Sequence, residues 1–65
     1  MTPARKAALQ WFHDLGAVSG IDTLASDAPS ARLFMLMQRE GQLVLTPEGW
    51  TLTDKGRRDL HEAGR

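Results

Sequence analysis

The residue types that most often carry out catalysis or bind metals are scarce in this chain. Its two histidines, His13 and His61, lie 48 positions apart, and no cluster of carboxylates accompanies either of them. The sequence has no cysteine, no glycine-rich phosphate loop and no Ser/His/Asp set suited to nucleophilic catalysis. We therefore expect no enzyme activity, no metal site and no cofactor.

Polar side chains in the segment 29–40 are better candidates for binding. Ser30, Arg32, Gln38 and Arg39 fall off the apolar stripe of the helix that we predict there, so they should face outward. Arginine and glutamine can each form paired hydrogen bonds with a planar partner. A binding surface is one interpretation of these residues. A solvated helix surface is the other, because the same residues would suit it equally well.

Arg57 and Arg58 form a second basic group, near the end of the chain. Their positive charge favours contact with an anion. Asp54 and Asp59 lie close by in the sequence, however, and a mixed charged helix face is an equally simple interpretation.

Five consecutive apolar residues, 33–37, interrupt the amphipathic pattern of the segment 29–40. Successive residues of a helix advance by about 100°, so the five cannot share one face. Leu33, Phe34 and Met37 form the inward stripe, and Met35 and Leu36 must point elsewhere. Adjacent exposed apolar side chains suggest a protein contact, with a second copy or another protein.

The first half of the chain predicts two helices. Thr2-Pro3 can start a helix over residues 3–15 and Gly16 can end it. Its apolar stripe should comprise Ala8, Trp11, Phe12 and Leu15. A short second helix should follow Ser19 and bury three side chains, those of Ile21, Leu24 and Ala25.

The second half predicts a helix, a hairpin and a last helix. Pro29 suits the first helical position of the segment 29–40, and Gly41 ends it. Two strands should then pair around a three-residue turn, Pro47-Glu48-Gly49, and Thr53 should cap the final helix. The four large aromatic residues all fall on inward positions of these elements: Trp11, Phe12, Phe34 and Trp50.

The length and charge of the chain limit the class of protein to which it can belong. Sixty-five residues suffice for one domain, and the formal net charge of zero argues against a general polyanion binder. The charge is uneven, since residues 13–27 carry three acidic and no basic side chains, whereas residues 28–58 carry five basic against three acidic. No apolar run is long enough for a membrane span and no signal peptide is evident, so we expect a cytoplasmic protein without a membrane partner.

The predicted order of elements resembles the winged helix-turn-helix transcriptional regulators. Residues 37–44, MQREGQLV, look like the end of a recognition helix that leads into the wing, and residues 50–58, WTLTDKGRR, are similar to the motif that ends the wing and opens the next helix. With the preceding helices, these motifs cover nearly the whole chain. The turn at residues 26–29 is shorter than in many relatives. The resemblance implies a mostly α domain over residues 1–65, with a three-helix core, a two-stranded antiparallel wing and a C-terminal helix.

The resemblance also implies a function. A small sequence-specific DNA-binding protein is expected, a transcriptional regulator or a mobile-element accessory factor, which acts as a homodimer on double-stranded DNA. In that arrangement the helix over 29–40 enters the major groove, where Arg32 reads guanine and Gln38 reads adenine. Ser30, Arg57 and Arg58 would contact phosphates, and Arg39 is a further DNA-contacting residue. The alternative is a winged-helix protein-interaction module that uses Met35, Leu36 and the wing.

Overall fold

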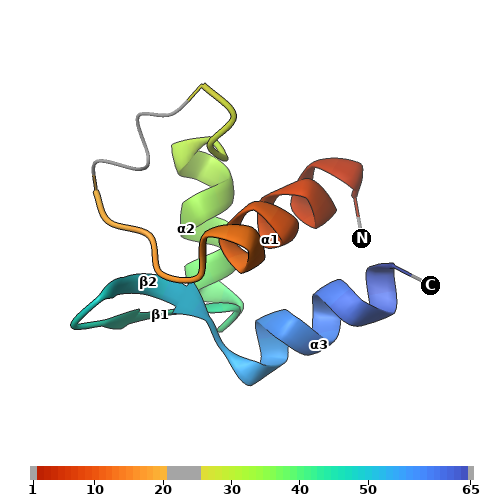
Figure 1. Cartoon of the computed structure of the whole chain (residues 1–65). Coiled ribbons are helices and arrows are strands. Elements are labelled where there is room, and N and C mark those ends of the chain that lie inside the picture. Colours follow the sequence, from red (N-terminus) through yellow and green to blue (C-terminus); the bar gives the residue numbers. More distant parts are fainter. Residues whose placement is uncertain (1, 21–25, 65) are drawn as a thin grey trace.

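The computed structural model of the chain describes residues 2–20 and 26–64 (Figure 1). Within those residues it contains three helices and one antiparallel hairpin, in the order α1 (Pro3–Leu15), α2 (Ala31–Arg39), β1 (Leu43–Thr46), β2 (Gly49–Leu52) and α3 (Asp54–Ala63). The predicted class, mostly α with a small β-hairpin, is confirmed. The short helix predicted after Ser19, with Ile21, Leu24 and Ala25, lies outside the described residues.

Hydroxyl side chains begin all three helices. The Oγ1 of Thr2 accepts a hydrogen bond from the N–H of Arg5 at 3.2 Å, and Thr53 does the same for Gly56 at 3.1 Å. At α2 the cap is Ser30, whose Oγ accepts from the N–H of Leu33 at 3.2 Å. The prediction that Pro29 occupies the first helical position is therefore wrong. The helix starts two residues later, because the serine hydroxyl supplies the cap that proline lacks.

The hairpin turn is tighter than expected. Thr46 pairs with Gly49, so the loop has two residues and the predicted three-residue loop is wrong. Gly49 adopts φ 129°, a conformation that other residues rarely adopt, and this allows β2 to begin one residue earlier. A Cβ at Gly49 would lie 2.6 Å from the carbonyl oxygen of Val18, so the close approach of the two backbones also requires glycine.

Val18 adds a third short segment to the sheet. Its N–H donates to the carbonyl oxygen of Trp50 and its own carbonyl accepts from the N–H of Trp50, both at 2.8 Å. The backbone after α1 is thereby attached to the outer edge of β2. The connector between the first two predicted helices thus has a specific partner, which fixes the exit of α1 against the hairpin.

The core lies between α1, α2, the hairpin and α3. Its fully buried apolar side chains are Leu9, Phe12, Val18 and Met37. Four aromatic rings continue it as a row, with centroids 5.0, 5.8 and 5.2 Å apart along the order Trp11, Phe12, Phe34 and Trp50. The inward placement predicted for the aromatic residues is confirmed, with Phe12 fully buried and the others packed against the buried cluster.

The apolar stripe predicted for α1 needs one correction. Leu15 is 48% exposed, whereas Leu9, which the stripe omitted, is completely buried. The helix packs against both β2 and α3, so its buried face is broader than one stripe and is centred on Leu9 and Phe12. Leu15 lies in the last turn, beyond the end of this contact.

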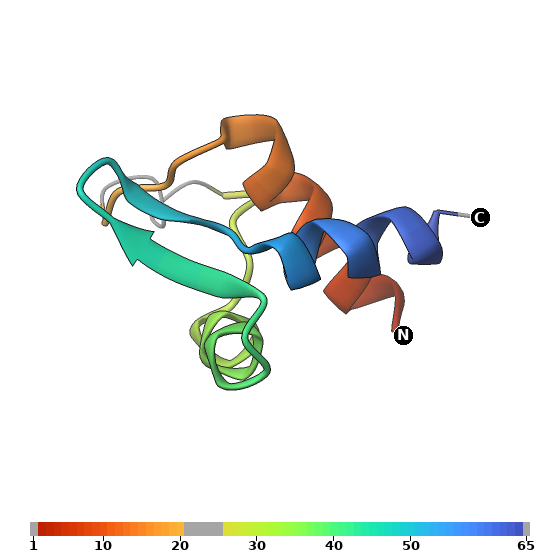
Figure 2. The same cartoon turned by 90° about the horizontal axis from the view of Figure 1, so that it is seen from below.

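Figures 1 and 2 show how the elements are arranged around the core. The hairpin tip projects away from α1 and α3 in both views. Figure 2 shows α2 nearly end-on at the edge of the molecule, with one side turned away from the other drawn elements. No helix in the described part of the chain is long and apolar enough to cross a membrane.

Candidate nucleic-acid interface

Four side chains on the open side of α2 border one shallow hollow of about 350 Å³: Arg32, Met35, Leu36 and Arg39. Their spacing of three, four and seven residues places them on one face of the helix. We call this set the α2 outer face. It brings together two of the predicted DNA-contacting residues and both predicted protein-interface residues.

The two arginines of the α2 outer face are exposed. Among the described residues, no carboxylate oxygen lies within 4.0 Å of Arg32 or Arg39. The acidic residue next to Arg39 in the sequence is Glu40, and its Oε2 instead pairs with Nη1 of Arg5 on α1 at 2.6 Å. The arrangement therefore leaves the positive charge of α2 available to an anionic partner.

The two apolar side chains of the α2 outer face differ in how exposed they are. Met35 is 67% exposed, the largest exposed fraction among the large hydrophobic side chains of the described residues. Leu36 is half-buried. The prediction that both side chains point away from the inward stripe therefore holds for Met35 and only in part for Leu36. Met37 is fully buried, as the stripe predicted.

Ser30 and Gln38 occupy different positions from the arginines. Ser30 is exposed, but one lone pair of its hydroxyl is already used to cap α2. The hydroxyl hydrogen and the first free N–H groups of the helix remain the donors at this end. Gln38 is half-buried and does not border the hollow on α2.

Arg57 and Arg58 lie on α3 rather than beside the α2 outer face. The guanidinium of Arg57 donates to the carbonyl oxygen of Leu52 at 3.0 Å and forms an ion pair with Asp54. It thus holds the start of α3 against the end of β2. Arg58 is exposed, and the structure gives it no ion pair within the described residues.

The histidines are closer in space than in the sequence. His13 on α1 and His61 on α3 border the same open hollow, together with Gln10 and Arg57. The described residues contain no group of three or more His, Asp, Glu or Cys side chains that could hold a metal ion.

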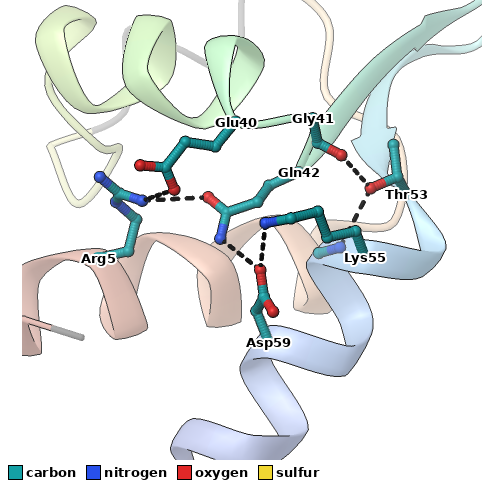
Figure 3. A network of polar contacts seen from close by, with 8 residues as sticks. Arg5, Glu40, Gly41, Gln42, Thr53, Lys55 and Asp59 are labelled. Carbon is teal, nitrogen blue, oxygen red and sulfur yellow. Dashed lines mark hydrogen bonds and ion pairs between the residues drawn. The ribbon is translucent and has the colours of Figure 1, made fainter.

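Sequence analysis missed the most connected polar residue, Gln42, which is 1% exposed (Figure 3). Its Nε2 donates to Oδ2 of Asp59 at 2.9 Å, and its Oε1 accepts from Nη1 of Arg5 at 3.4 Å. Its backbone N–H donates to Met37, and its carbonyl accepts from Thr53. One side chain thereby links α1 and α3 directly behind the C-terminal end of α2. The sequence signal for its burial was the position of Gln42, directly after Gly41 and at the start of an apolar strand.

The same network lowers the pKa of Asp59 below its ordinary value. The hydrogen bond from Gln42 is the largest cause, and a hydrogen bond from Nζ of Lys55 at 2.9 Å comes next. Both donors favour the ionised carboxylate. These polar contacts join α1 and α3 to the segment that directly follows α2, so they position the α2 outer face rather than form part of it.

Comparison of the chain with protein-family models, with curated proteins and with solved structures finds no match.

Proposed function

We propose that the chain is a winged-helix DNA-binding domain that inserts the α2 outer face into the major groove, in a transcriptional regulator or a mobile-element accessory protein. The observation that carries this proposal is the pair of exposed arginines on α2, Arg32 and Arg39, neither of which has a carboxylate partner among the described residues. A helix surface that exposes unpaired arginines matches the hydrogen-bond acceptors of guanine and the charge of phosphate.

The dimensions of α2 suit the groove. At a rise of about 1.5 Å per residue, Arg32 and Arg39 are separated by about 10 Å along the helix axis. This corresponds to about three base pairs at 3.4 Å each. The major groove is about 12 Å wide and admits a helix. The projecting hairpin beside α2 would then reach the neighbouring backbone, as the wing does in the resembled family (Figure 1).

The individual contacts differ in strength of support. In this proposal Arg32 reads guanine, and Ser30 with the start of α2 holds a phosphate; the exposure of both residues supports these roles. Arg58 is available for a phosphate contact, whereas Arg57 would first have to release Asp54 and Leu52. A single module of this size makes few base contacts, so we propose that two copies bind together.

Fluorescence anisotropy with labelled random and genomic duplexes tests the proposal. Binding at low salt should weaken as salt rises, with a log–log slope of about −0.9 for each phosphate contacted. Arg32→Gln should weaken binding to a selected duplex by about tenfold, since a bidentate arginine–guanine pair contributes roughly 1–3 kcal/mol of discrimination. Lys6→Gln removes the same charge from an exposed site on α1 and serves as the control.

Two results would contradict DNA binding through α2. One is the absence of any anisotropy change at tens of micromolar protein in low salt. The other is an equal loss of affinity in Arg32→Gln and Lys6→Gln, which would indicate a diffuse charge effect.

A second candidate function is protein binding through the apolar side chains of the α2 outer face together with the hairpin. Its specific support is the exposure of Met35 and of Leu45 on the hairpin, 67% and 63%, on a chain with zero net charge. Met35→Glu with Leu36→Glu should then dissociate a dimer or partner complex in sedimentation velocity. Leu15→Glu, which places a charge on an exposed apolar side chain in the last turn of α1, outside this surface, is the control. If the double variant sediments and binds as the natural chain does, this candidate is wrong.

A further inference from the structure

Met35 lies between the two arginines of the α2 outer face, three residues after Arg32 and four before Arg39. Its side chain is 67% exposed. Arg32 and Arg39 border the same hollow on α2, and the exposed fraction of Met35 shows that they do not cover it. A long apolar side chain thus stands at the middle of the α2 outer face, beside the half-buried Leu36 and between two arginines that have no carboxylate partner among the described residues.

The major groove offers one kind of apolar group to such a side chain. Base edges there present hydrogen-bond donors and acceptors, with the 5-methyl group of thymine as the apolar exception. A 5-methylated cytosine carries the same group at the same ring position. Arg32 and Arg39 complement the phosphates and guanine acceptors on either side, so the charge pattern favours DNA as the occupant of the whole face.

We infer that Met35 is a specificity-determining residue that packs against the 5-methyl group of a pyrimidine in the major groove. This inference rests on the proposed DNA-binding function. Arg32 lies about 4.5 Å and Arg39 about 6 Å from Met35 along the helix axis. These offsets correspond to about one to two base pairs. The recognised sequence therefore has a methylated pyrimidine between two arginine contacts.

The test removes the methyl group without changing any hydrogen bond. Duplexes selected from a random pool with the natural chain are resynthesised with uracil at each thymine in turn. A parallel set carries cytosine or 5-methylcytosine at each cytosine, which separates the two sources of the methyl group. Kd is measured for each duplex by fluorescence anisotropy at one fixed salt concentration.

The Kd should depend on the methyl group at one position of the duplex. Loss of its methyl group should weaken binding by the natural chain about fourfold, the effect of burying one methyl-sized group. Met35→Ala should bind the thymine and uracil duplexes equally. Leu15→Ala truncates an exposed apolar side chain at the end of α1, outside the proposed interface, and should keep the full response. Because Met35 lies outside the core, circular dichroism should show that the Met35→Ala variant is folded.

Three outcomes would overturn the inference. If duplexes bind but no methyl group affects Kd, Met35 does not read a methyl and DNA binding stands. If Met35→Ala keeps the methyl response and lowers the sedimenting mass, Met35 belongs to a protein interface. If no duplex binds at low salt, the proposed function itself fails, and the inference fails with it.

Discussion

The buried side chain of Gln42 donates a hydrogen bond to the carboxylate of Asp59 across 2.9 Å, and so joins the start of the hairpin to the middle of α3 (Figure 3). The same side chain accepts a hydrogen bond from Arg5 of α1. Three segments that are distant in the sequence therefore meet at one glutamine. The placement of α2 depends on this junction, because α2 ends only three residues before Gln42.

Gln42→Leu should lower the free energy of unfolding by about 1–3 kcal/mol. The leucine would fit an apolar site but would leave Arg5 and Asp59 without one of their partners in a partly buried position. Urea denaturation followed by circular dichroism measures the change. Gln10→Leu is the matched control, because Gln10 is exposed and bonds only Asp14 within the described residues, and its effect should stay within about 0.5 kcal/mol. Equal losses in the two variants would show that the junction adds no stability.

Asp59 should make stability depend on pH in the acid range. Its folded pKa lies below the ordinary value, so the ionised carboxylate favours folding at pH above about 4, the value for an unfolded aspartate. That contribution is lost as the pH falls through the lowered folded pKa. Asp59→Asn removes it, so the stability difference between the natural chain and the variant should shrink on acidification from pH 6 to below about 4.

Urea midpoints measured across that pH range provide the check for Asp59. Glu48→Gln, at the exposed hairpin tip, should retain the pH dependence of the natural chain. A stability difference that stays constant down to the lowest pH would contradict the role of the Gln42 and Lys55 hydrogen bonds.

Gly56→Ala should destabilise the chain, although alanine is ordinarily the better helix former by about 1 kcal/mol. A Cβ at this position of α3 would lie 2.4 Å from the carbonyl oxygen of Gln42, which is backbone and cannot turn aside. We expect a loss of about 1–3 kcal/mol in thermal or urea unfolding. Gly64→Ala, where the new Cβ would make ordinary contacts of 3.5 Å or more, should be nearly neutral. A Gly56→Ala variant more stable than the natural chain would show that α3 can move away from the hairpin.

Thr53→Ala should cost more stability than Thr2→Ala. Both hydroxyls cap a helix, but Thr53 also donates to the carbonyl oxygen of Gly41 at 2.5 Å and so ties α3 to the turn after α2. Loss of a cap usually costs about 1 kcal/mol, and the additional bond should bring the Thr53 variant to about 2 kcal/mol in urea denaturation. Thr53→Ser keeps the hydroxyl and should restore most of the loss. A serine variant as unstable as the alanine variant would assign the effect to the lost methyl group instead.

Helix ends and the hairpin could be predicted from the sequence because their causes are local. A hydroxyl three residues before a free N–H group, as at Thr2 and Thr53, and a glycine after the last turn, as at Gly16, act through neighbours in the chain. The inward stripe of α2 follows from helical periodicity for the same reason. The winged-helix assignment and DNA binding remain predictions, and fluorescence anisotropy with duplex DNA tests the second of them.

Other features depend on which surfaces meet in space. Periodicity placed Leu15 in the core and omitted Leu9, because the packing partners of α1 decide how wide its buried face is. The pairing of Val18 with Trp50 could not be predicted for the same reason.

The sequence by itself determined where the described helices and strands begin and end, to within a residue or two, because caps, turns and periodicity are local. Only the tertiary structure decided that Gln42 is buried at a junction of α1 and α3, and that Glu40 pairs with Arg5. Both contacts join residues far apart in the chain, and nothing in the local sequence of either partner specifies them. Glu40 is thereby held on the α1 side, and Arg39 on the α2 outer face has no carboxylate partner among the described residues.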